Sequence, residues 1–429
     1  MLKRATIVLA AAVMAVSVIA AVAQEQPIVL DLKSASQLAL TTSPQIGSAG
    51  ALADMSKAEV GKAKSALYPS VGAESSYSYL SKPTFFGTTP VLEKNTVINR
   101  IAAQQTVYSG GQIQAGLNRA RHGYVAASQG ARATRAEVLT GVGTAYFRAR
   151  QAKETIEVAN ASVKSLEASY DAAKKLHDSG VVTNSDVLRA QVALTSARSD
   201  SITATNDYNV ALAALRTAIG LPQSAHIDLA ADATDTAPDA ASLAAPVERP
   251  EIAAGSASIQ AAEAGKKAAR AGRLPVVALS ADYFNEPKGA QFPRLTNTVM
   301  ASVMIKLNVF DGGLTRASID EADAASRKAQ QDFKIEERQV ELEQQAAKLN
   351  LDSASARVET TATQVESAEE SLRALQAGYK EGMTPLTDVL SAQTALATAR
   401  MNRLTALYDV KIAQISLLRA YGQTDVLVR

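Results

Sequence analysis

The chain contains no cysteine and no tryptophan, and only 4% of its residues are aromatic. Without cysteine it can form no disulfide, no thiolate metal site and no acyl-cysteine lipid anchor. Beyond residue 23, no run approaches the roughly 18 consecutive apolar residues that a membrane-spanning helix needs. Small side chains dominate instead, and this composition favours long helices packed closely together over one large rounded core.

The first 23 residues are typical of a secretory signal peptide. Lys3 and Arg4 precede an apolar run, and Ala21-Val22-Ala23 matches a cleavage site, so we predict export and cleavage near Ala23. An uncleaved membrane anchor is the alternative. Loss of Lys3 and Arg4 leaves 44 − 2 = 42 basic residues against 42 acidic ones, a net charge of about zero. This balance predicts no nucleic-acid partner.

The sequence is an internal duplication. Residues 108–111 (Tyr-Ser-Gly-Gly) return 202 residues later as 310–313 (Phe-Asp-Gly-Gly), and 180–191 return as 382–393 at the same offset. Two proline pairs repeat at an offset of 206, Pro44 with Pro250 and Pro69 with Pro275. The period is too long for solenoid repeats of about 20–50 residues. Both halves must therefore share one architecture.

Hydrophobic periodicity predicts the same order of elements in each half. In the first half (24–220), a helical stretch at 32–67 precedes strands at about 70–82 and 96–108, a long helix at 112–177 and a helix at 185–219. In the second half (250–422), a short helix at 251–272 precedes strands at about 276–286 and 297–310, a long helix at 314–377 and a helix at 387–421. A connector (221–249) and a tail (423–429) complete the chain.

The last strand alternates cleanly between apolar and polar residues. Its apolar face would carry Val299, Ala301, Val303, Ile305, Leu307 and Val309. This pattern is typical of a membrane strand between lipid and water, although an amphipathic strand on a soluble core is the alternative. Four strands leave two open edges, and unpaired backbone is costly in hydrocarbon, so several copies would have to close one barrel.

The second long helix carries a heptad stripe that is typical of coiled-coil packing. Its members are Val340, Gln344, Ala347, Leu351, Ala354, Val358, Thr361, Val365, Ala368, Leu372 and Leu375. A weaker line of Leu342, Leu349 and Ala356 indicates a second neighbour. The predicted fold class is mainly α, with a membrane β-barrel and long coiled-coil helices.

The strand exits at 105–111 and 307–313, the two tips at 180–194 and 382–396, and the opening at 30–44 resemble the TolC-like outer-membrane efflux proteins. The resemblance covers essentially the whole mature chain. It implies a homotrimer with a 12-stranded barrel in outer-membrane lipid above a periplasmic α-helical barrel. It also implies an outer-membrane channel of a tripartite efflux or type I secretion system. Such a channel would be a passive duct that works with an inner-membrane pump and a periplasmic adaptor (membrane fusion) protein.

The same resemblance implies that residues after each tip line the periplasmic entrance. Asp186 and Asp388 fall on family acids, and Tyr379 falls on a tyrosine of the constriction. The family's second aspartate is Ser391 here, and its latch arginine is Thr384, so the gate should carry less charge. The tips themselves, Gly180-Val181 and Gly382-Met383, are the implied adaptor contacts.

Each of these residues also has an ordinary structural interpretation. Asp186 and Asp388 lie in the first turn of a helix, where a carboxylate interacts favourably with the macrodipole, and this is compatible with pore lining. Gly110-Gly111 and Gly312-Gly313 lack the lysine of a phosphate loop and predict tight strand-to-helix turns.

No constellation of catalytic residues points to an enzyme, and we expect neither a cofactor nor a metal. A soluble periplasmic coiled-coil scaffold or adaptor is the alternative to a channel. The sequence identifies no cargo.

Overall fold

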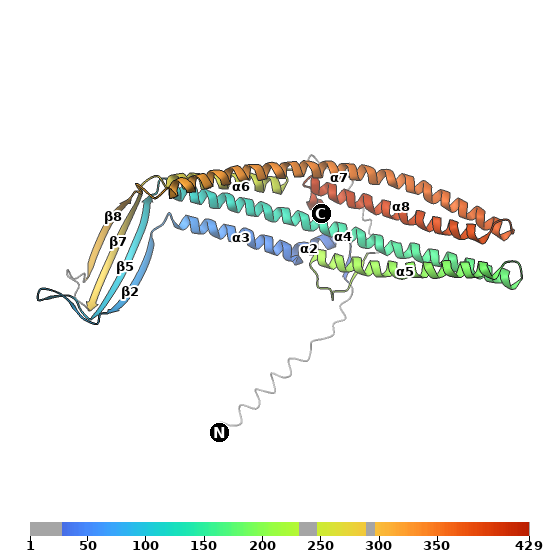
Figure 1. Ribbon diagram of the computed structural model, residues 1–429, viewed down its shortest axis with the longest axis horizontal. Helices are drawn as coiled ribbons and strands as arrows, with labels where there is room; N and C mark the ends of the chain where they lie inside the picture. The colour runs from blue at the N-terminus through green and yellow to red at the C-terminus, as the bar shows by residue number, and fades with distance from the viewer. Residues whose placement is uncertain (1–27, 231–246, 289–296, 429) are drawn as a thin grey trace, which may run out of the picture.

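A computed structural model describes residues 28–230, 247–288 and 297–428 of the chain. The molecule is elongated, with a sheet at one end from which long helices run to the other end (Figure 1). The signal peptide expected at 1–23 lies outside the described residues. Within them, no helix is both long and apolar enough to cross a membrane.

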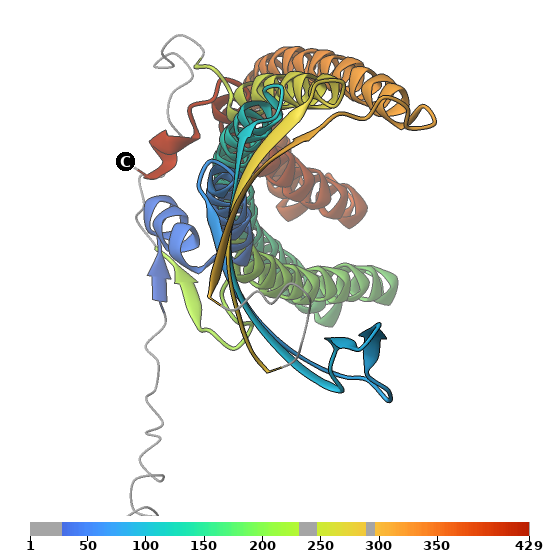
Figure 2. The same cartoon turned by 90° about the vertical axis from the view of Figure 1, so that its left-hand side faces the viewer.

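The sheet has four antiparallel strands in the order β2-β5-β7-β8. They are β2 (Ser70–Tyr79), β5 (Asn95–Tyr108), β7 (Val276–Lys288) and β8 (Thr298–Lys306). The sheet curves, and the helices continue its arc (Figure 2). The strand edges of β2 and β8 have no partner strand among the described residues.

The two faces of the sheet differ in polarity. Side chains alternate along a strand, so the register assigns Glu74, Arg100, Asp282 and Lys306 to one face. Arg100 Nη2 lies 2.7 Å from Asp282 Oδ1, and the carboxylate is only 3% exposed. The opposite face is mostly apolar and includes Val71, Ile101, Leu279, Tyr283, Val299, Val303 and Ile305.

Two predicted strands are shorter in the structure. β8 ends at Lys306, although the sequence predicts a strand to 310, because its partner β7 begins at Val276 after a proline that cannot donate to the ladder. Val309 and Phe310 are 91% and 90% exposed beyond that end. β2 ends at Tyr79 instead of 82.

The loop after β2 contains a hairpin that the sequence does not predict. It pairs β3 (Thr84–Phe86) with β4 (Thr89–Leu92), and Gly87 lies between them with a φ of 62°.

Glycine pairs form the turns from sheet to long helix. Gly110, Gly111, Gly312 and Gly313 all have φ between 62° and 92°. This region is unfavourable for residues with a Cβ atom. At Gly110 a Cβ would also lie 2.6 Å from the Cβ of Leu274. The chain can therefore pass directly from strand to helix at both positions.

Two helices of 67 residues each, about 100 Å, run nearly the whole length of the helical part. These are α4 (Gln112–Asp178) and α7 (Leu314–Lys380). α3 (Pro44–Ser65) and α5 (Asn184–Ile219) pack one after the other along α4 (Figure 1). α6 (Pro250–Ala271) and α8 (Leu386–Ala420) pack in the same way along α7, and both also contact α4.

The heptad stripe of α7 forms its packed side. Val340, Ala347, Ala354, Val365 and Leu372 are buried. Leu342 and Leu349, on the weaker line, are each 59% exposed in the single chain.

The largest core cluster lies midway along the molecule. There α2 (Leu32–Thr42), α4, α5 and α8 meet β1 (Ile28–Leu30) and β6 (Ile227–Leu229), which pair in parallel. Tyr146 and Phe147 of α4 are fully buried in this cluster. The Tyr408 hydroxyl of α8 donates to Glu154 of α4, and burial is the main cause of the raised pKa of Tyr408.

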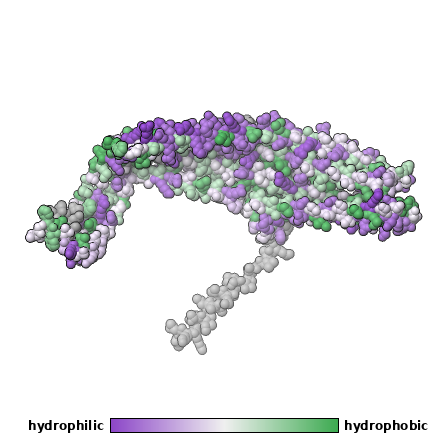
Figure 3. All heavy atoms as spheres, viewed as in Figure 1, coloured by the Kyte–Doolittle hydropathy of each residue, from purple (hydrophilic) through white to green (hydrophobic). Residues whose placement is uncertain are grey.

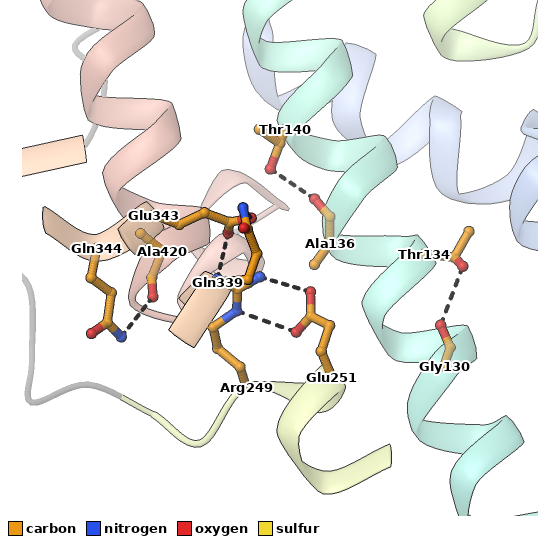
Figure 4. Close-up of polar contacts among 10 residues, drawn as sticks. All are labelled: Gly130, Thr134, Ala136, Thr140, Arg249, Glu251, Gln339, Glu343, Gln344 and Ala420. Atoms are coloured by element: carbon orange, nitrogen blue, oxygen red, sulfur yellow. Dashed lines mark hydrogen bonds and ion pairs between the residues drawn. The ribbon is translucent and has the colours of Figure 1, made fainter. Parts of the chain in front are cut away.

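A buried arginine joins the start of α6 to α7. Arg249, which is 4% exposed, donates through Nη2 to Glu251 (2.9 Å) and through Nη1 to Glu343 (2.6 Å) (Figure 4). The neighbouring Gln344 donates to the carbonyl oxygen of Ala420 at the end of α8. These contacts tie α6, α7 and α8 together at one level.

Both non-repeated segments contain structure. The connector at 221–249 includes β6, and its residues 231–246 lie outside the described residues. The tail forms a 3-10 helix, η2 (Thr424–Val428), because Leu427 is buried in the midway core.

Candidate functional site at the helical tips

The first tip is the turn between α4 and α5. Gly180 adopts a φ of 74°, and the Val181 amide donates to the Leu176 carbonyl, which closes the end of α4. α5 then starts after Thr183. The Asp186 carboxylate accepts from the Thr183 hydroxyl at 2.9 Å and from its amide at 3.3 Å. Asp186 therefore caps its own helix.

The second tip repeats this turn between α7 and α8. Gly382 has a φ of 76°, and the Met383 amide donates to the Gly378 carbonyl. The residue before α8 is Pro385, which has no amide hydrogen for Asp388 to accept. Asp388 is exposed, and its carboxylate is contacted by the Thr387 hydroxyl at 3.4 Å. The carboxylate of Asp388 is thus open to solvent.

The two hairpins meet around Tyr379. A small cluster contains Ala173 of α4, Ala190 of α5 and Leu386 of α8, and Tyr379 of α7 packs against it. Burial raises the pKa of Tyr379, with a smaller contribution from the nearby Asp186 carboxylate. Its hydroxyl is buried without a hydrogen-bond partner among the described residues. Tyr379 therefore joins the hairpins by packing rather than by a hydrogen bond.

The two positions where the resemblance implies an arginine and a second aspartate lie at different depths. Thr384 is half-buried, and its hydroxyl occupies the space that a Cβ on Gly378 would need. Ser391 is exposed one turn beyond Asp388. The site therefore contains one exposed acid on α8 and no arginine at position 384.

Gln393 makes a buried contact that the sequence does not single out. It is 5% exposed, and its Nε2 contacts the Ser165 hydroxyl (2.8 Å), the Ser169 hydroxyl (2.9 Å) and the Ser165 carbonyl (3.2 Å) on α4. The equivalent Gln191 in the first half is exposed. The repeat pairs these two residues, but it contains no signal for which one is buried.

A groove runs beside this contact, between α5 and α8 above α4. Its volume is about 440 Å³. Small and polar side chains line most of it, including Ala159, Ser162, Ala197, Thr394 and Thr398.

Within residues 28–230, 247–288 and 297–428, no group of three histidines or acids is arranged to hold a metal ion.

Comparison with known proteins identifies the family. The model of the outer membrane efflux protein family matches residues 35–221 and 244–423. Protein CyaE of Bordetella pertussis is 26% identical over 414 residues, which cover 92% of this chain and 84% of that protein. TolC of Vibrio cholerae is 25% identical over 300 residues, 68% of each protein.

A crystal structure of CusC has the same fold, with a TM-score of 0.81 at 20% identity, over 92% of this chain and 93% of that one. The family model spans both halves of the duplication and both tips. This chain therefore belongs to the outer membrane efflux protein family, whose members are outer-membrane efflux channels.

Proposed function

We propose that three copies of this chain close one 12-stranded barrel in the outer membrane and one helical cylinder in the periplasm. The observation that carries this proposal is the pair of open sheet edges, β2 and β8, on a sheet that has one apolar face. Four strands from each of three chains give 4 × 3 = 12 strands. Eight strands would leave an interior filled by side chains, whereas 12 leave room for a duct.

The two lateral sides of the helical wall support the same assembly. On the side of α3 and α5, Leu52, Met55, Val192 and Ile202 are 55–72% exposed. On the opposite side, Ile335, Leu342 and Leu349 of α7 are 59–66% exposed. Such stripes are typical of surfaces that a neighbouring helix covers. A closed ring of copies would cover both sides at once, together with both strand edges.

In this assembly the tips form the periplasmic entrance of a passive duct. Asp388 and Ser391 would face the opening, and Tyr379 would hold the α7–α8 hairpin against Ala173 and Ala190. Val181 and Met383, which are 67% and 72% exposed, would contact the periplasmic adaptor. The inner-membrane pump would supply the energy.

Two measurements test this proposal. Light scattering in detergent should give three chain masses per particle, and a monodisperse single chain would contradict the assembly.

In planar bilayers the channel should conduct, and trivalent cations should block it at the periplasmic side. Asp388→Ala should weaken this block, whereas Asp332→Ala, an exposed acid elsewhere on α7, should leave it unchanged. An unchanged block in Asp388→Ala would show that Asp388 does not line the entrance.

A further inference from the structure

The helix ends beside the sheet carry an excess of positive charge. We define the sheet-end band as residues 58–65, 112–119, 263–274 and 307–323. Its basic residues are Lys62, Lys64, Arg119, Lys266, Lys267, Arg270, Arg273 and Arg316, and its acidic residues are Glu59, Glu263, Asp311, Asp320, Glu321 and Asp323. The net charge is 8 − 6 = +2 per chain, and Asp323 pairs with Lys266 and Arg270.

The opposite end of the molecule is neutral. Residues 171–191 and 373–393, around the two tips, contain five basic and five acidic residues, so 5 − 5 = 0. The positive charge is therefore a property of the sheet end and not of helix ends in general.

Ion pairs of α4 show which face of this helix points to the concave side of the arc that the helices form. Arg135 pairs with Asp425 of η2, and Lys153 pairs with Asp228 of β6. η2 and β6 lie on the convex side of the arc (Figure 2). At about 100° per residue, Gln112 and Arg119 lie on the opposite, concave face of α4.

Two basic residues of the sheet-end band point to the convex side, and a third lies just beyond the end of α6. A hollow on the concave face is lined by Gln112 and Arg119 of α4, by α6 residues such as Gly265 and Ala268, and by α7 residues such as Ser318 and Ala325. Arg316 lies about 180° around α7 from Ala325. Lys267 likewise lies on the side of α6 away from the hollow. Arg273 follows the end of α6 at Ala271, and all three basic residues are exposed.

A ring of exposed apolar side chains lies directly between this charge and the sheet. Tyr68, Tyr108 and Phe310 are 60%, 48% and 90% exposed. Tyr68 lies between α3 and β2, Tyr108 ends β5, and Phe310 lies between β8 and α7. In Figure 3 a hydrophobic patch lies where the sheet meets the helices, next to hydrophilic atoms at the start of the helical part. Aromatic residues at this position are typical of the level where a membrane sheet leaves the hydrocarbon.

We infer that Lys267, Arg273 and Arg316 form a collar that binds the anionic headgroups of phospholipids in the periplasmic leaflet of the outer membrane. The inference rests on the proposed function, because it places the sheet in that membrane. Basic side chains just outside the hydrocarbon attract anionic lipid headgroups that lie within a Debye length. The exposed Tyr68, Tyr108 and Phe310 side chains would keep the collar at the level of these headgroups.

The test uses the full chain purified in a zwitterionic detergent. Its thermal midpoint, followed by circular dichroism, is measured with added phosphatidylglycerol or with phosphatidylcholine of the same acyl chains. Phosphatidylglycerol should raise the midpoint more, and 0.5 M salt should remove most of that difference. Inorganic phosphate at equal concentration should not reproduce it.

Matched variants locate the effect. Lys267→Gln/Arg273→Gln/Arg316→Gln should lose most of the phosphatidylglycerol shift, and Lys267→Arg/Arg273→Lys/Arg316→Lys should keep it. Lys174→Gln/Lys175→Gln/Lys380→Gln, which removes three exposed cations at the tips, should also keep it.

Three results would overturn the collar. These are equal shifts with both lipids, a full shift in the glutamine variant of the collar, or the same loss in the tip variant. Conductance in bilayers of phosphatidylcholine alone separates the two proposals. A channel that conducts there but shows no preference for phosphatidylglycerol would support the duct and contradict the collar.

Discussion

In each half of the chain, a glycine at the end of the last helix packs against the segment that precedes the first proline-started helix. We call these two contacts the joints, and their polar groups differ. At the end of α5, Gly220 packs against Thr42 and Ser43, and the Thr42 hydroxyl donates to the Ile219 carbonyl. At the end of α8, Gly422 packs against Val247 and Arg249, and the arginine is buried between two carboxylates. The duplication thus preserves the close backbone approach at glycine, while the polar contacts that surround it differ.

The final helices differ in what they pack against. α8 lies against both α7 and α4, whereas α5 packs mainly against α4. Leu404 of α8 is 7% exposed, and its equivalent Ile202 of α5 is 72% exposed. Burial is therefore decided by the number of neighbours a helix has and not by its sequence alone. Three pairs of substitutions, and the pH response at two sites, can break or sharpen this comparison.

The largest difference should be at the joints. Arg249→Ala leaves Glu251 and Glu343 without their buried partner, which typically costs about 3–5 kcal/mol. Ser43→Ala, at the equivalent position, should cost less than about 1 kcal/mol, because the Ser43 side chain makes no capping hydrogen bond. Urea unfolding in detergent, followed by circular dichroism, measures both. Equal losses would show that the ionic joint is no more important than the neutral one.

The pH dependence of the ionic joint follows from Glu251. Burial opposes the ionisation of Glu251. The hydrogen bond from Arg249, a backbone hydrogen bond and the charges of Arg249 and Arg419 together outweigh burial and lower the pKa of Glu251. A carboxyl with a lowered pKa in the folded state contributes stability above its unfolded pKa, near 4.5, and that stability is lost as the pH falls. Arg249→Ala should therefore reduce the acid sensitivity of unfolding.

The next largest difference should be between the final helices. Leu404→Ala removes a core side chain and should cost about 2–5 kcal/mol. Ile202→Ala should cost less in folding free energy and should act mainly on association between copies. The unfolding free energy and the dissociation of the oligomer are measured separately. An equal loss of folding free energy would show that α5 is as deeply packed within its own chain as α8.

A smaller difference should appear at the paired glutamines. Gln393→Ala leaves the hydroxyls of Ser165 and Ser169 unpaired in a buried contact and should cost about 1–3 kcal/mol. Gln191→Ala should be within about 0.5 kcal/mol of the unchanged protein. The same unfolding experiment compares them, and a neutral Gln393→Ala would show that packing alone joins α4 to α8.

The smallest effect is expected at Tyr379. Its hydroxyl has no hydrogen-bond partner among the described residues, so Tyr379→Phe should change the unfolding free energy by less than about 0.5 kcal/mol. Because the pKa of Tyr379 is raised in the folded state, its neutral hydroxyl contributes to the free energy of unfolding. This contribution is fully present below the pKa of the unfolded state, near 10, and is lost as the pH rises through the folded pKa. Tyr379→Phe should remove this part of the alkaline destabilisation, and an undiminished pH response would assign it to another group.

Much of the secondary structure is predictable because its signals are local. Both long helices begin within a residue of the predicted positions, where positive-φ glycines end the preceding segment. Pro44 and Pro250 start α3 and α6, because proline fits the first helical turn. Strand ends are less predictable, since the end of β8 depends on where β7 begins.

Contacts between distant segments carry no local signal. β1 and β6 are three residues each and pair across about 200 positions of the sequence, so neither has a recognisable period. At the tips, the sequence and its family resemblance single out Asp186 and Asp388. The structure shows that Asp186 is a capping residue and that Asp388 is exposed, and the difference arises because Pro385 stands where the first half has Thr183 and its amide hydrogen.

By itself, the sequence determined the duplication, the lengths of the helices and the glycine turns, because these depend on residues that are neighbours along the chain. The tertiary structure decided which member of each repeated pair is buried, as with Gln393 and Gln191 or Leu404 and Ile202. The physical reason is that α8 lies in contact with both α7 and α4, so equivalent side chains lose water in one half and keep it in the other.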